Sequence, residues 1–240
     1  MERERLRQFP APRLIPFTAP RPTVDEARAR VQARLASARE RRSVRHFSTD
    51  PVPLDVLQGL VAIAAQAPSG ANRQPWRFVI VLDAAIKRAI REAAENEERE
   101  SYDHRMPDEW LAALAPLGVD WRKPFLEDAP ALIVMFRKDR EVLRPDAVHA
   151  QDERAPGEVL KAYYSQESCG IAAGMLIAAI HEAGLVTLTH TPSPMGFLAR
   201  ILGAEEGEKP FLLLPVGFRA EHCAVPDVHR KPFEQVCSVR

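Results

Sequence analysis

Short, continuous apolar runs are the feature that most restricts how this chain can fold. They cover residues 76–82, 130–136 and 211–218, and a shorter run covers 185–189. A strand that is apolar on both sides is buried on both faces, so these runs must lie inside the molecule. Segments with helical patterns separate them, without a regular alternation of strand and helix. We therefore predict an α+β fold with a central mixed β-sheet covered by helices.

Helical patterns predict the elements that cover this sheet. In residues 53–67, apolar residues recur at the spacing of an amphipathic helix. The second half of residues 157–185 is apolar nearly all round. We expect helices over 24–42, 53–67, 83–102 and 157–185. The last would be the central helix of the fold, with Gly184 as its C-cap.

Composition also predicts how the chain is divided. Residues 1–22 are rich in Pro and Arg and indicate an extended N-terminal arm, followed by a single domain over 23–240. Residues 103–124 carry three prolines and many charges, and they indicate an excursion that acts as a lid, which we place at about 96–125. A further polar loop is expected over 138–156.

Charge and cysteine content exclude several classes of partner. The 33 basic and 33 acidic residues cancel, so no net field attracts nucleic acid or an anionic membrane. The longest weakly polar run, 170–180, is too short to span a bilayer, and the N-terminus lacks the apolar core of a signal peptide. The three cysteines and seven histidines form no metal or redox motif. We predict a cytoplasmic protein without a metal site.

Several segments carry side chains suited to a phosphate-bearing cofactor. Arg41, Arg42 and Arg45 lie within five residues, and guanidinium groups bind phosphate bidentately. The loop APSGANRQPW permits close backbone approach to a planar ligand, and the hydroxyls of Thr189 and Thr191 could bond to its ring. A solvated basic cluster and ordinary strand threonines are the alternatives. No GxGxxG or Walker motif occurs, so a Rossmann or P-loop site is not supported.

Three polar residues suggest a site for a zwitterion. Glu98 and Tyr102 are four residues apart in a helical pattern, so their side chains leave the same face, and Lys123 follows in DWRKPF. A carboxylate, a phenol and an ammonium aimed at one point could hold both ends of an amino acid. Taken singly, each has a plainer explanation, namely a solvated charge run, a half-buried helical residue and a surface lysine.

Five motifs in a fixed order carry a resemblance. RRSVR, APSGANRQPW, GLVTLTHTP, LLLPVGF and PDVHRKPFEQV follow one another from about residue 40 to the C-terminus. In this order they resemble the nitroreductase superfamily of FMN enzymes, and within it the iodotyrosine deiodinase branch. The lid-like insertion is part of the resemblance. It implies a nitroreductase-like fold, a domain-swapped homodimer, and FMN bound at the interface between subunits.

The resemblance also implies a role for each candidate residue. Those that would hold the FMN phosphate and ribityl chain are Arg41, Arg42, Ser43, Arg45 and Arg230. Those that would line the flavin ring are Ser69, Gly70, Thr189, His190 and Thr191. Thr191, near the ring N5, is the catalytic candidate, whereas His190 stands where vertebrate relatives carry Thr. Those that would bind substrate are Ala71 through its N–H, Glu98, Tyr102 and Lys123.

The function implied is FMN-dependent reductive dehalogenation of a halotyrosine. NAD(P)H would supply electrons, directly or through a reductase. The lack of a membrane anchor makes the chain look like a soluble bacterial relative. Two alternatives stay open: an FMN-dependent nitro or quinone reductase of broad aromatic specificity, and a flavin-dependent protein that binds tyrosine derivatives without turnover.

Overall fold

The computed structural model describes residues 13–142 and 159–240. It divides into two compact units, Met1–Arg41 and Arg42–Arg240. In the first unit, residues 13–22 contain neither helix nor strand, and α2 (Val24–Glu40) follows. This helix begins with a capping box, in which Thr23 Oγ1 accepts the N–H of Glu26 and the Glu26 carboxylate accepts the N–H of Thr23.

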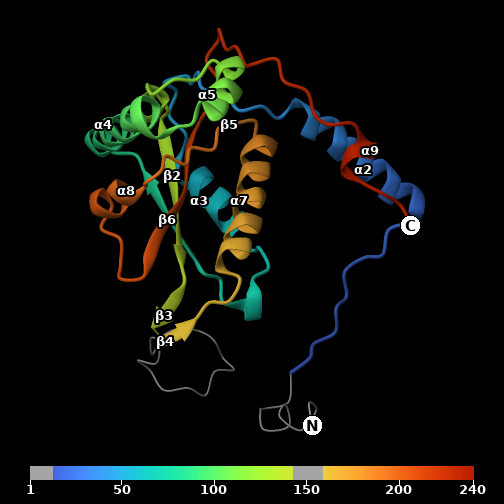
Figure 1. The fold of residues 1–240 in the computed structure, drawn as a ribbon. Coiled ribbons are helices and arrows are strands. Elements are labelled where there is room, and N and C mark those ends of the chain that lie inside the picture. Colours follow the sequence, from blue (N-terminus) through green and yellow to red (C-terminus); the bar gives the residue numbers. More distant parts are fainter. Residues whose placement is uncertain (1–12, 143–158) are drawn as a thin grey trace. The chain divides into compact units, whose positions relative to one another are not determined.

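A four-stranded antiparallel sheet forms the centre of the second unit (Figure 1). Its strands lie in the order β1 (Trp76–Val81), β2 (Ala131–Lys138), β6 (Glu208–Gly217) and β5 (Val186–Thr187). All neighbouring pairs among these four strands are antiparallel, whereas the sequence led us to expect a mixed sheet. The excursion between β1 and β2 starts and ends at the same end of the sheet, because Val81 pairs with Leu132. A return at the same end makes neighbouring strands antiparallel.

Two helical layers cover the two faces of this sheet (Figure 1). Ile133 and Met135 of β2 pack into one core with α3 (Leu54–Ala64) and α7 (Ser165–Glu182). The alternate β2 residues face the other core, whose helices are α4 (Ala84–Glu100), α6 (Phe125–Asp128) and α8 (Gly196–Ile201). Burial on both faces explains the continuous apolar run over 130–136. The run over 76–82 is only partly buried, because β1 lies at the edge of the sheet.

The central helix is shorter than its sequence pattern suggests. Residues before it form β4 (Val159–Lys161), which pairs antiparallel with β3 (Arg140–Val142), and α7 starts only at Ser165. Leu160 is buried between two exposed neighbours, the alternation of a strand. The loop predicted over 138–156 lies largely outside the described residues. Gly184 ends α7 as expected, with a left-handed φ of 75° one residue past the C-cap.

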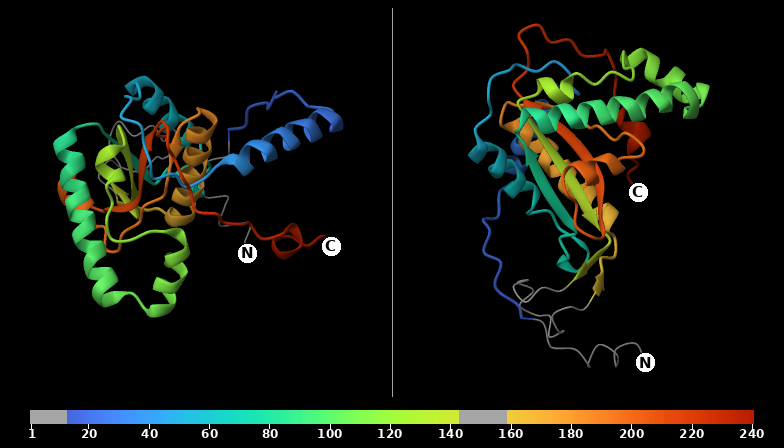
Figure 2. Two further views of the ribbon diagram at one scale, coloured as in Figure 1. Left: turned by 90° about the horizontal axis from the view of Figure 1, so that it is seen from above. Right: turned by 90° about the vertical axis from the view of Figure 1, so that its left-hand side faces the viewer.

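The excursion between β1 and β2 extends beyond the sheet (Figure 2). Asp83 caps α4, and after Glu100 the helix widens into a π-helical turn, η2 (Ser101–Arg105). The chain then returns through α5 (Asp108–Leu114) and η3 (Ala115–Leu117) to α6. The far end of the chain carries the short helix α9 (Phe233–Val236). In the described part of the chain, no helix has the length and apolar character needed to cross a membrane.

Gly70, in the loop before β1, packs closely against the residues just before α7. A Cβ added at Gly70 would lie 2.8 Å from the carbonyl oxygen of Tyr163, closer than real contacts allow. We therefore expect Gly70→Ala to lower the free energy of unfolding by about 1–3 kcal/mol, the usual cost of overpacking. A Cβ added at Gly59, in α3, would meet no neighbouring atom within 4 Å. Gly59→Ala is the control and should be neutral or stabilising by up to about 1 kcal/mol. Urea unfolding of both variants measures these free energies, and a Gly70→Ala variant that is as stable as the wild type would contradict the prediction.

Candidate active site

The arginine-rich segment lies beside the strand that leads to the two threonines. Ser43 and Thr187 form a parallel bridge, in which the N–H of Val44 donates to the carbonyl of Thr187 at 3.1 Å. Ser43, Thr189 and Thr191 are all exposed. The structure thus brings together two of the segments predicted to bind cofactor. Arg41 is the last residue of the first unit.

The start of the C-terminal tail runs along the same segment. The N–H of Ser48 donates to the carbonyl of Phe218 at 2.9 Å, and the N–H of Ala220 donates to that of His46 at 3.0 Å. Further along, the guanidinium of Arg42 donates to the carbonyl of Pro226. Arg230 is exposed four residues later, and no contact among the described residues joins it to the other arginines.

The loop before β1 holds an unusual backbone conformation. Ala71, Asn72 and Gln74 have φ values of 51°, 52° and 48°, in the left-handed region that non-glycine residues rarely adopt. The loop is fixed from both sides, because Ser69 Oγ accepts the N–H of Gln74 at 2.8 Å and the N–H of Gly70 donates to a serine hydroxyl of α7 at 3.3 Å. Strained backbone clusters at functional sites. Composition alone identified this loop but gave no sign of the strain.

Glu98, Tyr102 and Lys123 meet in space. The Lys123 Nζ lies 3.3 Å from the Glu98 carboxylate and 5.6 Å from the centre of the Tyr102 ring. It also donates to the carbonyl of Asp120, while the Tyr102 hydroxyl donates to the carbonyl of Val119 at 3.4 Å. Lys123 is only 6% exposed, so its plainer explanation as a surface lysine is wrong. We call these three side chains the clamp.

Burial sets the protonation behaviour of the clamp. Removal from water lowers the pKa of Lys123, and the neighbouring Glu98 opposes that shift. Burial also raises the pKa of Tyr102, with Glu98 and Asp120 adding to it. Arg45, whose own pKa is lowered by burial, acts electrostatically on both Tyr102 and Lys123. An arginine from the predicted phosphate set therefore lies close enough to the clamp to influence it.

His190 faces away from the two exposed threonines that flank it. Its backbone N–H and C=O pair with Leu213 at 2.9 and 3.1 Å, and its buried ring meets Phe125 edge-on at 5.9 Å. Its Nε2 has no partner among the described residues. Burial lowers its pKa to about 3, with the charges of Lys123 and Arg45 adding to the shift. The ring thus lies in the core beside Phe125, whereas Thr189 and Thr191 on either side of His190 are exposed.

Sequence reasoning missed two residues of this region. The Trp121 ring lies under the guanidinium groups of Arg99, at 4.1 Å, and Arg122, at 4.7 Å. Glu95 accepts the backbone N–H of Lys123 at 2.8 Å. Glu95 belongs to the acidic run AENEERE, in which no local signal separates a partly buried, hydrogen-bonded carboxylate from solvated ones. Over residues 13–142 and 159–240, no group of three or more His, Cys, Asp or Glu side chains is placed to hold a metal ion.

The fold defines the class of protein. Residues 38–218, more than half of the chain, match the model of the nitroreductase family. The chain therefore belongs to this family. A nitroreductase with bound FMN from Bacteroides fragilis shares the fold, with a TM-score of 0.58 at 18% identity, over 86% of this chain and 98% of that one.

Nearer relatives define the branch. The iodotyrosine deiodinase of Haliscomenobacter hydrossis is 58% identical over 191 residues, which is 80% of this chain and 81% of that protein. Mouse iodotyrosine deiodinase 1 is 40% identical over 92% of this chain and 74% of its own. An oxidized iodotyrosine deiodinase crystallised with FMN and 3-iodo-L-tyrosine superposes with a TM-score of 0.69 at 30% identity, over 86% of this chain and 97% of that chain. These relatives place the chain in the iodotyrosine deiodinase branch.

The buried His190 makes stability depend on pH. Its pKa falls from 6.5 to about 3 on folding, so acid favours the unfolded state, which takes up the proton. Its contribution is complete above pH 6.5 and is lost as the pH falls toward 3. We expect the wild type to lose about 1.4 kcal/mol per pH unit more than His190→Gln across this window. Urea unfolding of the FMN-loaded proteins at pH 7, 6 and 5 measures it, with the exposed His46→Gln as control. Parallel curves for wild type and His190→Gln would contradict it.

Proposed function

We propose that this chain is an FMN-dependent oxidoreductase that removes halogen from halotyrosines. The observation that carries the proposal is the convergence of a carboxylate, a phenol and a buried ammonium on the excursion between β1 and β2. A site for a neutral aromatic compound needs no such arrangement, whereas an amino acid presents an ammonium and a carboxylate to be bound. The similarity to iodotyrosine deiodinases supports the same substrate class.

The side chains beside β5 suit FMN. Arginine guanidinium groups can bind a phosphate, and exposed hydroxyls beside them can bond to the ribityl chain and ring. The residues that would hold the phosphate end are Arg41, Arg42, Ser43, Arg45 and Arg230. The residues that would line the ring are Ser69, Gly70, Thr189, His190 and Thr191. Of these, His190 would not contact the flavin through its ring, because the ring lies in the core and the backbone N–H and C=O of His190 already pair with Leu213.

The clamp would hold the two charged ends of the substrate. Glu98 would take the ammonium, Tyr102 and Lys123 the carboxylate, and the Ala71 N–H the phenolate oxygen. Because Glu98 and Lys123 already pair with each other, binding replaces one ion pair by two, and only the difference contributes to affinity. Closure of the excursion at about 96–125 as a lid would keep water from the reacting carbon.

The reaction replaces the carbon–halogen bond with a carbon–hydrogen bond and releases halide. It consumes two electrons and one proton, and FMN supplies the electrons after reduction by NAD(P)H, directly or through a reductase. The chain's own residues bind the phenolate, orient the halogen-bearing carbon and exclude water. The exposed Thr191 hydroxyl would donate a hydrogen bond to the flavin N5. A cytoplasmic location stays a prediction.

Anaerobic turnover tests the proposed function. The protein should purify with non-covalent FMN, and Arg45→Ala should lower the flavin occupancy. After chemical reduction, each two-electron turnover of the wild type should release one iodide, which converts diiodotyrosine to monoiodotyrosine and, with further reductant, monoiodotyrosine to tyrosine. A flavin-loaded, fully reduced protein that binds diiodotyrosine without releasing iodide would contradict the proposal and favour a binding protein.

The clamp makes a prediction that separates this function from general nitroreduction. Glu98→Gln keeps the side-chain size but removes the charge that pairs with the substrate ammonium. We expect it to weaken iodotyrosine binding by about 1.5–3 kcal/mol, the range for a hydrogen bond to a charged group. Quenching of FMN fluorescence reports the binding. Reduction of a neutral nitroaromatic is the control and should change little, and if Glu98→Gln binds iodotyrosine as tightly as wild type, a nitro or quinone reductase becomes the better interpretation.

We also propose that the protein is a homodimer. Helix α7 is apolar on its outward side, where Ile171 is 48% exposed and Gly170 and Gly174 leave open space. On the neighbouring helix α3, Ile63 is also 48% exposed. A second copy of the chain would cover this surface, and the tail and arm would embrace it in a domain-swapped arrangement.

Sedimentation of the flavin-loaded protein tests the dimer. We expect the mass of two chains at micromolar concentration. Ile171→Asp places a charge on the proposed interface and should shift the protein toward monomer with loss of flavin. Ile86→Asp, on the opposite helical layer, is the matched control and should stay dimeric. A flavin-loaded monomer for the wild type would rule out the proposed interface.

A further inference from the structure

Glu95 holds the main chain of the residue that forms the cationic half of the clamp. It lies three residues before Glu98 on α4, so both carboxylates face the segment that carries Lys123. Glu95 Oε1 accepts the Lys123 N–H at 2.8 Å, while Glu98 lies 3.3 Å from the Lys123 Nζ. Helix α4 therefore contacts Lys123 at both its backbone and its ammonium.

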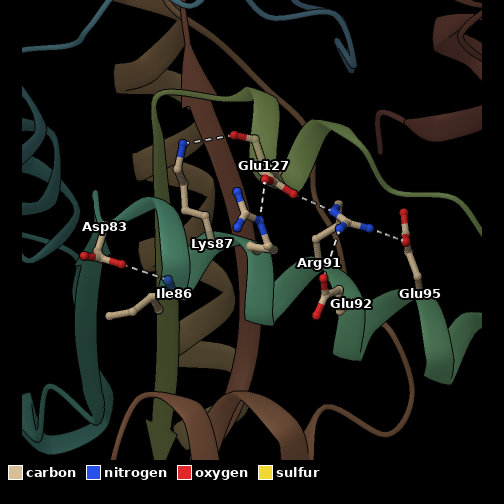
Figure 3. A network of polar contacts seen from close by, with 8 residues as sticks. Asp83, Ile86, Lys87, Arg91, Glu92, Glu95 and Glu127 are labelled. Atoms are coloured by element: carbon tan, nitrogen blue, oxygen red, sulfur yellow. Dashed lines mark hydrogen bonds and ion pairs between the residues drawn. The ribbon is translucent and has the colours of Figure 1, made fainter.

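Glu95 is itself held in place. Its second carboxylate oxygen accepts from Arg91 Nη1 at 2.6 Å, and Arg91 Nε donates to Glu127 at 2.7 Å (Figure 3). Its side chain is only 14% exposed. Both oxygens of this partly buried carboxylate accept hydrogen bonds, one from Arg91 and one from the N–H of Lys123.

The chain after Lys123 is joined to the same helix. Glu127 of α6 also accepts from Arg88 at 3.0 Å, and the Lys87 ammonium donates to the carbonyls of Glu127 and Ala129 at 3.0 and 2.6 Å. Figure 3 shows the contacts of Lys87 and Arg91 with Glu127 and of Arg91 with Glu95. The segment from Lys123 to Ala129 is therefore attached to α4 along its length, and Glu95 makes the attachment nearest the clamp.

We propose that Glu95 is a positioning residue that sets Lys123 for the carboxylate of the substrate. This inference rests on the proposed function. Exposed ion pairs contribute little to stability, so the outer part of the network gives no strong reason for a carboxylate that is only 14% exposed at this position. The hydrogen bond from the Lys123 N–H gives such a reason, because a binding group loses much of its contact energy when it is displaced slightly.

The proposal predicts which ligands respond to Glu95. 3-Iodotyrosine and 3-iodotyramine share the iodophenol and the ammonium, but only 3-iodotyrosine has a carboxylate. Loss of Glu95 should weaken binding of 3-iodotyrosine by about three- to tenfold, the range for one hydrogen bond, and leave 3-iodotyramine unchanged. A general loss of structure would weaken both ligands and the flavin together.

Binding to the FMN-loaded protein, followed by quenching of FMN fluorescence, tests this. Glu95→Ala removes the acceptor, and Glu95→Asp keeps the charge but shortens the reach, so both should lose affinity for 3-iodotyrosine alone. Glu95→Gln keeps an acceptor oxygen and should recover most of it. Glu92→Ala is the matched control, because Glu92 pairs with Arg91 at 3.4 Å and is not bonded to Lys123.

The outcomes separate this inference from the proposed function. If Lys123→Ala weakens 3-iodotyrosine binding but Glu95→Ala and Glu95→Asp do not, the positioning role is wrong and the clamp stands. Equal losses for both ligands, or for Glu92→Ala, also overturn it. In the Lys123→Ala background, Glu95→Ala should cause no further loss, and an additive loss contradicts the proposal. A wild type that binds the two ligands equally refutes the carboxylate contact of the clamp and with it this inference, whereas the proposed function is tested separately by the release of iodide from diiodotyrosine.

Discussion

A buried ammonium must be paired, and this constraint organises the most specific part of the molecule. Lys123 is 6% exposed, and its Nζ is compensated by the Glu98 carboxylate and the Asp120 carbonyl. An unpaired cation there would be strongly destabilising. Glu98 can release Lys123 only if something else takes its place, and a zwitterion offers both charges needed. In the proposed function, the same pairing that stabilises the fold also supplies the two charges that would bind an amino acid.

The topology of the sheet makes this pairing possible. Because β1 and β2 are antiparallel neighbours, the chain between them leaves and returns at one end of the sheet. Helix α4 leads out and the segment at Lys123 leads back, so residues 28 positions apart in sequence lie side by side. The cofactor candidates reach the same region differently, through the bridge between Ser43 and Thr187. Arg45 links the two regions, since its charge acts on Tyr102 and Lys123.

Much of the fold and of the candidate site could be predicted from the sequence, but strand direction and contacts between distant residues could not. The apolar runs predicted the buried strands, and the spacing of Glu98 and Tyr102 predicted a shared face. The start of α7 at Ser165 was missed, because a Tyr pair and flanking polar residues suit a helix as well as a short strand. Strand direction depends on where connections return, which periodicity does not encode. The contact of Glu95 with Lys123 and the inward ring of His190, whose backbone pairs with Leu213, depend on partners distant in sequence.

The central claim is that α4 and the returning segment recognise a zwitterion. The most direct test is the affinity of the oxidised, FMN-loaded wild type for ligands that keep one aromatic group and lose the charges in turn. Isothermal titration of 3-iodotyrosine against 2-iodophenol, at one pH and one salt concentration, isolates the amino-acid part. Binding of the amino acid exchanges the Glu98–Lys123 pair for two new pairs, a net gain of one charged contact of about 1.5–3 kcal/mol, so 2-iodophenol should bind at least about tenfold more weakly. Equal affinities for the two would contradict the account.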